Sequence, residues 1–292
     1  MILKLSAFRL KNLLILALIM FVIRYKLFEV FDEKMIANNA ASIKFVFYIF
    51  GSVLIAAAGY LQNNFLDQEV DQLNGKKTKF NLTPGFTRGA FVILNVMALL
   101  FLFVFKWRGV VLFGVAPILM LLLYNFYLKK IGLVGNVLVA FLASYQLMGL
   151  IVCDLPIGDQ VFWNSTIFQY VLFLLGSSFL IMLSREIVKD IEDQEGDSQM
   201  KYKTLPIIIG QKASKVLAGV LILITLFYFI SFIAQNEIGS WFSYLFAFFI
   251  LLILLVAFFS IVKSKQKEDF SEVSFLLKVA MGLAATLLLF IP

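Results

Sequence analysis

The sequence predicts an all-α integral membrane protein, built as a bundle of about nine transmembrane helices. Of its 292 residues, 62% are hydrophobic and 15% are charged, whereas soluble domains are about half apolar and a quarter charged. Long apolar stretches also recur along the whole chain, without the alternation of apolar and polar residues that is typical of membrane β-strands. These two observations favour membrane helices over a soluble fold or a β-barrel.

Nine apolar segments account for the predicted helices. Some are shorter than the roughly 20 residues that cross a bilayer, and we expect flanking residues to extend them. The first segment is followed by Arg24 and Lys26 and has no small-residue cleavage pattern, so we interpret it as a short membrane helix. In chain order the segments are Asn12–Ile23, Phe45–Gln62, Gly89–Phe105, Gly109–Tyr124, Leu133–Cys153, Thr166–Leu183, Val216–Ala234, Trp241–Val262 and Val273–Ile291.

The lysines and arginines predict the orientation of the bundle. With the N-terminus in the cytoplasm, 18 of them fall on the cytoplasmic side and 6 on the opposite side, while Lys278 lies inside the ninth segment. This bias follows the positive-inside rule. We therefore expect a multi-pass protein of the bacterial inner (cytoplasmic) membrane, and we interpret the net charge of +7 as membrane orientation rather than nucleic-acid binding.

The two longest hydrophilic stretches, about residues 63–88 and 184–215, join helices two to three and six to seven. We expect these loops to form a cytoplasmic cap on a single domain that spans residues 1–292. Acidic clusters follow the second and sixth helices in the same way. This predicts two four-helix repeats, about residues 1–130 and 131–265, with a ninth helix appended.

The two acidic clusters share one spacing, i, i+3, i+7, which places three side chains on one face of a helix. The first trio is Asn64, Asp67 and Asp71, and the second is Asp190, Asp193 and Asp197. If the trios face each other, five carboxylates converge and repel one another unless cations lie between them. As a bland alternative, each cluster is simply a solvated helix end.

The composition limits the cation that these carboxylates could bind. The chain has no His and a single Cys, Cys153, so a metal must be held by oxygen ligands. Oxygen ligands suit Mg²⁺, Ca²⁺ or Mn²⁺. Of these, Mg²⁺ typically takes one or two protein carboxylates and completes its coordination with water and phosphate oxygens. Two carboxylate faces around a Mg²⁺-bridged diphosphate would balance every charge. The sequence thus predicts Mg²⁺ at Asp67, Asp71, Asp190, Asp193 and Asp197.

Basic and aromatic side chains on the same predicted side of the membrane could bind the diphosphate. Arg185 and Lys189 lie one turn apart before the second trio, and Tyr124 and Lys129 end the fourth helix. Lys76, Lys77 and Lys79 follow the first trio, where they could equally be membrane anchors. A tyrosine at the position of Tyr124 is more often an interfacial aromatic than a ligand. Helices rich in Phe, Leu and Ile could line a groove for an isoprenoid tail, and a lipid-facing surface has the same composition. A diphosphate neutralised by metals and cationic side chains is a good leaving group, which suits transfer of a prenyl group.

Two motifs resemble the UbiA superfamily of intramembrane prenyltransferases. The family pattern N-D-x-x-D-x-x-x-D stands here as Asn63-Asn64-x-x-Asp67-x-x-x-Asp71. The second pattern, D-x-x-D-x-x-x-D, stands as Asp190 to Asp197 and is followed by Lys203-Thr204-Leu205-Pro206. The segment from Tyr124 to Lys129, followed by Gly135-Asn136, resembles the family's connection between the fourth and fifth helices. The resemblance covers essentially the whole chain.

The resemblance implies Mg²⁺-dependent transfer of a prenyl group from a prenyl diphosphate to a membrane-soluble or amphipathic acceptor. It implies that the five aspartates are catalytic and hold Mg²⁺ and diphosphate, and that Asn63 and Asn64 support the first site. Lys129, Arg185 and Lys189 would bind the diphosphate. The overall pattern is most similar to members that alkylate a glycerol-phosphate lipid precursor (geranylgeranylglycerol-phosphate geranylgeranyltransferase-like), and an aromatic quinone precursor is the second acceptor class.

The sequence departs from the family pattern at two places. Asn64 replaces the usual first Asp, which keeps an oxygen donor but removes a charge. Asn74-Gly75-Lys76-Lys77 stands where the family more often has N-x-P-x-R. The change at Asn64 leaves open a non-catalytic relative that acts as a partner or scaffold. The trios could also be the site of a membrane transporter or binding protein for a divalent cation or phosphorylated lipid, although their matched spacing and Lys203-Thr204-Leu205-Pro206 argue against that class.

Overall fold

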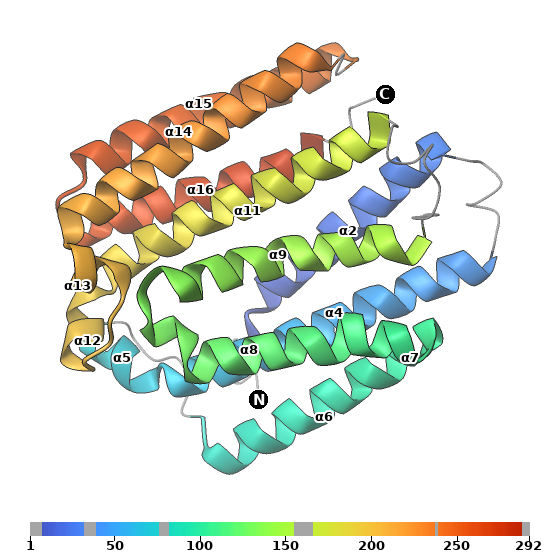
Figure 1. The fold of residues 1–292 in the computed structure, drawn as a ribbon, viewed down its shortest axis with the longest axis horizontal. Helices are drawn as coiled ribbons and strands as arrows, with labels where there is room; N and C mark the ends of the chain where they lie inside the picture. The colour runs from blue at the N-terminus through green and yellow to red at the C-terminus, as the bar shows by residue number, and fades with distance from the viewer. Residues whose placement is uncertain (1–7, 32–38, 76–81, 155–165, 237–238, 288–292) are drawn as a thin grey trace.

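The structure, a computed structural model, describes residues 8–31, 39–75, 82–154, 166–236 and 239–287. Long helices run side by side through the molecule, and short helices gather at one end of them (Figure 1). The long helices are α2 (Leu10–Phe31), α4 (Asn39–Leu66), α6 (Pro84–Leu102), α8 (Ala116–Phe126), α9 (Gly132–Asp154), α11 (Thr166–Glu192), α14 (Gln211–Gln235), α15 (Trp241–Lys263) and α16 (Lys267–Leu287). The described residues contain no strand, which confirms the all-α prediction.

Seven helical stretches of the described chain are long and apolar enough to cross a membrane. They are Ile43–Leu66, Pro84–Phe105, Val110–Lys130, Gly132–Gly149, Gln211–Gln235, Trp241–Lys263 and Lys267–Leu287. α2 contributes a shorter apolar stretch, Asn12–Val22, and α11 carries the second acidic cluster at its end. Within the described residues the helices coincide with the nine predicted segments, the last of which runs past the end of α16 at Leu287, while the number of membrane crossings stays a prediction.

Between α6 and α8 the chain runs through short helical turns. They are η2 (Phe103–Phe105), α7 (Lys106–Gly109) and the π-helical turn η3 (Val110–Val115). The predicted fourth segment, Gly109–Tyr124, therefore begins as a π-turn and becomes α-helical at Ala116. After α8 the turn η4 (Leu128–Lys130) leads into α9. This turn is important because it carries Lys129 to the same end of the bundle as the acidic clusters.

Five long helices enclose the part of the bundle that ends at these clusters. Contacts join α2 to α4, α4 to α9, α9 to α11, α11 to α16 and α16 back to α2. Side chains such as Ile55, Ile187 and Leu277 are almost fully buried between these helices. α6 packs outside α4, and α14 and α15 pack outside α11 and α16. These five helices therefore pack against one another in a closed series of contacts.

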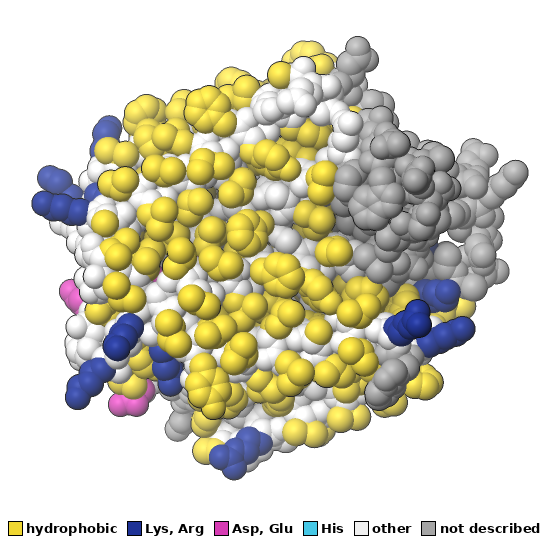
Figure 2. All heavy atoms as spheres, viewed as in Figure 1, with side chains coloured by type: hydrophobic (Ala, Val, Ile, Leu, Met, Phe, Trp, Pro, Cys, Tyr) yellow, Lys and Arg dark blue, Asp and Glu magenta, His cyan; other side chains and the backbone are white. Residues whose placement is uncertain are grey.

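The outer surface has the pattern of a membrane protein. Large apolar side chains such as Leu100, Val216 and Phe227 are about two-thirds exposed. In Figure 2 apolar side chains cover the middle of the visible face, and lysines and arginines lie toward its two ends. A surface this apolar needs a lipid environment rather than water. The fold is thus that of an integral multi-pass membrane protein.

Candidate active site

Each acidic cluster lies where a long helix gives way to a short one. α4 ends at Leu66 and α5 (Gln68–Leu73) follows, while α11 ends at Glu192 and α12 (Gln194–Gln199) follows. The residue between the helices is the middle member of its trio, Asp67 in one case and Asp193 in the other, with nearly equal backbone angles. Two junctions of the same design support the predicted four-helix repeat, which itself stays a prediction.

The trios therefore span a bend, whereas the sequence predicts them on one helix face. Backbone hydrogen bonds of helical spacing continue through both bends, from Asp71 N to Asp67 O (2.8 Å) and from Asp197 N to Asp193 O (3.1 Å). This continuity preserves the relative placement of i, i+3 and i+7 side chains. The helix-face prediction is thus refined: the first member of each trio belongs to the long helix and the last to the short one.

The first cluster is bound to residues from two other elements. The Nζ of Lys129, on η4, forms an ion pair with Asp67 Oδ1. Arg9, which directly precedes α2, donates from Nη2 to Asn64 Oδ1 at 2.9 Å, and its guanidinium lies over the ring of Tyr60. Asn63 is partly buried on the last turn of α4. The amide at position 64 thus accepts a charged hydrogen bond, a role that a carboxylate would also perform.

The end of α8 is fixed against the end of α4. Asn125 Nδ2 donates to Gln62 Oε1 at 3.1 Å, and both side chains are buried. This bond holds Tyr124 within electrostatic range of Asp67, Asp190, Glu186 and Arg9. Tyr124 therefore lies near both clusters, and its role as a ligand stays a prediction.

The second cluster is bound mainly to α9. Asn136 Nδ2, one turn into α9, donates to Asp190 Oδ2 at 2.8 Å. Arg185 pairs with its neighbour Glu186, with Nη1 and Oε1 2.6 Å apart. The sequence predicts Arg185 as a diphosphate ligand, and this structure gives its guanidinium a carboxylate partner already. Its buried Nε has no hydrogen-bond partner, so part of its bonding capacity remains for a ligand.

The two clusters meet at the end of the bundle, as the sequence predicts for facing trios. The backbone N–H of Gly196 on α12 donates to Asn74 Oδ1, the residue after α5, at 2.9 Å. Asp197 lies within electrostatic range of Asp67 from the first cluster and of Lys189 on α11. Asp71 and Asp193 are partly buried beside them and take part in interactions of their own.

The negative charge where the two clusters meet affects the pKa of Asp197. The pKa of its carboxyl is raised to about 6, chiefly by burial and also by the neighbouring Asp193 and Asp67, while the Thr204 hydroxyl and the charge of Lys189 oppose the shift. Burial also raises the pKa of Tyr202, and Asp67, Asp197 and Glu69 add to the increase. The region thus carries a negative charge that a cation would relieve.

No three acidic side chains in the described part of the chain lie close enough together to form a ready metal site. The structure brings Asp67, Asp190 and Asp197 into one region without completing a coordination shell. Lys76, Lys77 and Lys79 lie outside the described residues. Sequence reasoning gave no role to Arg9, Asn74, Glu186 or Asn136. In the sequence Arg9 counts only among the cytoplasmic positive charges, and its hydrogen bond to Asn64 is seen only in three dimensions.

Residues 35–279 match the UbiA prenyltransferase family. The chain is 29% identical to digeranylgeranylglyceryl phosphate synthase of Methanosphaera stadtmanae, over 81% of this chain and 84% of that protein. It is 32% identical to the enzyme of the same name from Sulfolobus acidocaldarius, over 64% of this chain and 66% of that protein.

Solved structures share the fold over nearly the whole chain. A structure reported for digeranylgeranylglyceryl phosphate synthase covers 98% of this chain and 96% of its own, with a TM-score of 0.69 and 21% identity. A UbiA homologue of Archaeoglobus fulgidus, bound to GPP and Mg²⁺, covers 98% and 99% with a TM-score of 0.60 and 12% identity.

Proposed function

Because this chain belongs to the UbiA prenyltransferase family, which confirms the resemblance in its motifs, we propose that it alkylates a glycerol-phosphate lipid precursor. That the protein is a membrane prenyltransferase follows from the family match over most of its length. The acceptor is our proposal, and it rests on relatives that are named digeranylgeranylglyceryl phosphate synthase. No observation on the described residues favours the aromatic quinone precursor over this acceptor.

One observation carries the assignment of the site: Asp67 and Asp197, from clusters far apart in the sequence, lie within electrostatic range of each other in a partly buried space. The two clusters offer carboxylate oxygens and the amide oxygen of Asn64, in a chain without His, and such oxygen ligands fit Mg²⁺. Residues that we propose as its ligands are Asp67, Asp71, Asp190, Asp193 and Asp197. Bound Mg²⁺ would supply charge neutralisation for the diphosphate leaving group.

The remaining residues have roles in binding. We propose that Lys129, Lys189 and Arg185 bind diphosphate oxygens with their cationic groups. Asn136 holds Asp190 in place through its 2.8 Å hydrogen bond, and Arg9 does the same for Asn64. We also propose that Asn63 and Tyr124, which lie near the clusters, bind the substrate. When the allylic carbon–oxygen bond breaks, its electron pair leaves with the diphosphate. An acceptor hydroxyl oxygen then forms the new bond to carbon, and the hydroxyl proton passes to the released diphosphate or to water.

We further propose that the acidic clusters and the N-terminus face the cytoplasm. The support is the distribution of Lys and Arg, 18 against 6. The fold supports it as well, because Arg9, both acidic clusters and η4 lie at the same end of the bundle. The membrane would then be the cytoplasmic membrane. The expected bacterial source stays untested, and the relatives named above come from archaea.

The proposed function is tested with purified protein, Mg²⁺ and a panel of prenyl diphosphates, offered with geranylgeranylglyceryl phosphate or an aromatic quinone precursor. Wild type is expected to consume geranylgeranyl diphosphate with the glycerol-phosphate lipid. Asp193→Asn is expected to lose at least about 100-fold in rate, since even outer-shell changes at metal sites cost about 10–100-fold. Glu195→Gln, an exposed neutralisation on the same short helix, is the matched control. Equal rates for wild type and Asp193→Asn across the panel would refute the assignment.

A further inference from the structure

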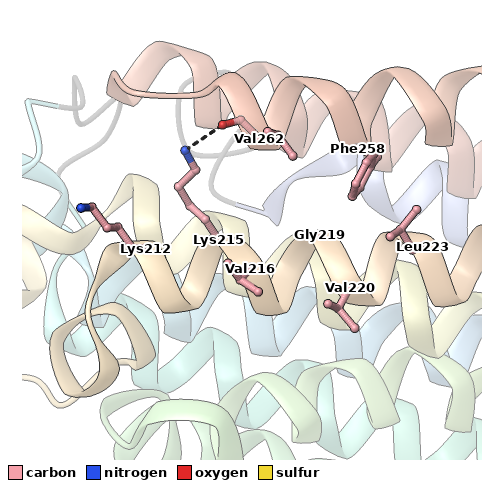
Figure 3. Close-up of a pocket in the computed structure, with 8 residues that line it drawn as sticks. All are labelled: Lys212, Lys215, Val216, Gly219, Val220, Leu223, Phe258 and Val262. Atoms are coloured by element: carbon pink, nitrogen blue, oxygen red, sulfur yellow. Dashed lines mark hydrogen bonds between the residues drawn. The ribbon is translucent and has the colours of Figure 1, made fainter.

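A groove lies on the outer face of the bundle between α14 and α15, away from the active site. Its volume is about 460 Å³. Figure 3 shows its lining: Lys212 and Lys215 at one end, and apolar side chains along the rest. None of the lining residues belongs to α4, α5, α9, α11 or α12, which carry the active site. The groove is therefore a separate feature of the surface.

The apolar part of the groove faces the membrane. Val216, Val220 and Val262 along it are 67%, 44% and 59% exposed, and both helices are long enough to cross a bilayer. Gly219 opens the floor, because a Cβ placed there would contact the ring of Phe258 at 3.6 Å. The packed helices leave this space unfilled, and in a membrane the material available to fill it is a hydrocarbon chain.

The polar end of the groove carries positive charge. Lys215 Nζ is fixed over the C-terminal end of α15, where it donates to Ser264 O at 2.5 Å and to Val262 O at 3.2 Å. An ammonium has three N–H donors. Two are taken by these carbonyls, and the ring of Phe270 lies 6.0 Å from Nζ, which still permits an anion at the third. Lys212 is exposed in the first turn of α14, whose N-terminal end adds a partial positive charge.

One acid lies near this end. Asp269 is within electrostatic range of Lys215, and its carboxylate accepts hydrogen bonds from the backbone N–H groups of Lys265 and Gln266 at 2.7 and 2.9 Å. That carboxylate is thus oriented toward the turn between α15 and α16. Two lysines and the N-terminal end of α14 still outweigh one carboxylate and the partial negative charge at the C-terminal end of α15, so the lysine end of the groove is complementary to an anion.

We propose that this groove binds one anionic phospholipid of the surrounding bilayer, with its phosphate at Lys212 and Lys215 and one hydrocarbon chain over Gly219. A positive end followed by an apolar channel matches the order of groups in such a lipid. α14 begins beside α13 (Leu205–Ile209), at the end of the bundle that holds the acidic clusters (Figure 1). The lipid would therefore belong to the leaflet on the active-site side.

Native mass spectrometry of the full chain, equilibrated with phosphatidylglycerol, phosphatidylcholine or diacylglycerol, tests the proposal. One phosphatidylglycerol is expected to be retained in preference to the other two. Lys212→Gln should weaken its binding about 3-fold, the size of one exposed ion pair. Gly219→Leu should abolish its binding by filling the floor. The controls are Lys106→Gln, at the far end of the bundle, and Gly89→Leu, which adds the same side chain to the exposed face of α6.

Prenyl-transfer rate in detergent checks that each variant is folded, since the groove lies outside the active site. The proposal is overturned if phosphatidylcholine is retained as well as phosphatidylglycerol, or if Gly89→Leu reduces retention as much as Gly219→Leu does. It is also overturned if geranylgeranyl diphosphate displaces the bound lipid, because the groove would then belong to the substrate.

Discussion

The ion pair between Lys129 and Asp67 gives the sharpest test of how the active site works. In this structure Lys129, which we propose as a diphosphate ligand, forms an ion pair with Asp67, which we propose as a metal ligand. Lys129→Gln removes the positive charge and keeps a side chain of similar length. The change leaves Asp67 available to a cation and takes one cation away from the diphosphate. Binding of Mg²⁺ should therefore become tighter, and binding of the prenyl diphosphate should become weaker.

The burial of the pair sets the size of the effect. The side chains of Lys129 and Asp67 are 8% and 22% exposed. The pair thus lies between surface ion pairs, worth up to about 1 kcal/mol, and buried pairs, whose disruption costs about 3–5 kcal/mol. A coupling of about 2 kcal/mol corresponds to a change of about 30-fold in a binding constant. Mg²⁺ should bind the substrate-free variant more tightly by about this factor.

Isothermal titration of Mg²⁺ into substrate-free protein measures the first effect, and KM for the prenyl diphosphate measures the second, which should rise. Lys130→Gln is the matched control, because it removes the same charge from the same turn η4. Lys130 is exposed, and its Nζ lies over the ring of Tyr202. If Mg²⁺ affinity falls in Lys129→Gln, or changes equally in both variants, the competition between Lys129 and the cation is refuted.

Further predictions follow from other contacts of the site. Asn64→Asp should keep or raise the prenyl-transfer rate, because a carboxylate also accepts the hydrogen bond from Arg9; a large loss would mean that the site requires the amide. Gly196→Ala should lower the free energy of unfolding by about 1–3 kcal/mol, since its Cβ would lie 2.5 Å from Asn74 Nδ2. Gly85→Ala should not lower it in this way, because nothing lies within 4 Å of a Cβ there. Asp197 has its pKa raised to about 6 from 3.8, so its contribution to the stability of the metal-free protein should be greatest below about pH 4 and fall as the pH rises through 6. Mg²⁺ affinity, which requires the carboxylate, should rise over the same range and then level off; a flat titration between pH 5 and 7 would contradict this.

Much of the fold is readable from the sequence because membrane helices are local features. A bilayer demands about 20 apolar residues per crossing, so each of the nine segments coincides with a helix in the structure. The helix ends are less predictable. α11 continues nine residues beyond the apolar segment that ends at Leu183, because polar residues such as Lys189 and Asp190 stay helical once they reach the polar end of the bundle.

The composition of the site was also predictable, and its pairing was not. Spacing brought Asp67, Asp71, Asp190, Asp193 and Asp197 forward as a set, and the absence of His limited the metal to oxygen ligands. Spacing could not reveal that Arg185 pairs with Glu186 or that Arg9 donates to Asn64. The roles of the five aspartates as metal ligands stay predictions until the variants above are measured.

The sequence by itself determined the helical membrane fold, the family and the oxygen-rich donor set, since hydrophobic period, motif spacing and residue type are properties of the chain alone. Only the tertiary structure decided which charges meet. Asn64 lies 55 residues from Arg9, Asp67 lies 62 from Lys129, and Gly196 lies 122 from Asn74. Such contacts depend on how the five helices pack together. Electrostatic energy depends on the distance between two charges rather than on their separation along the chain.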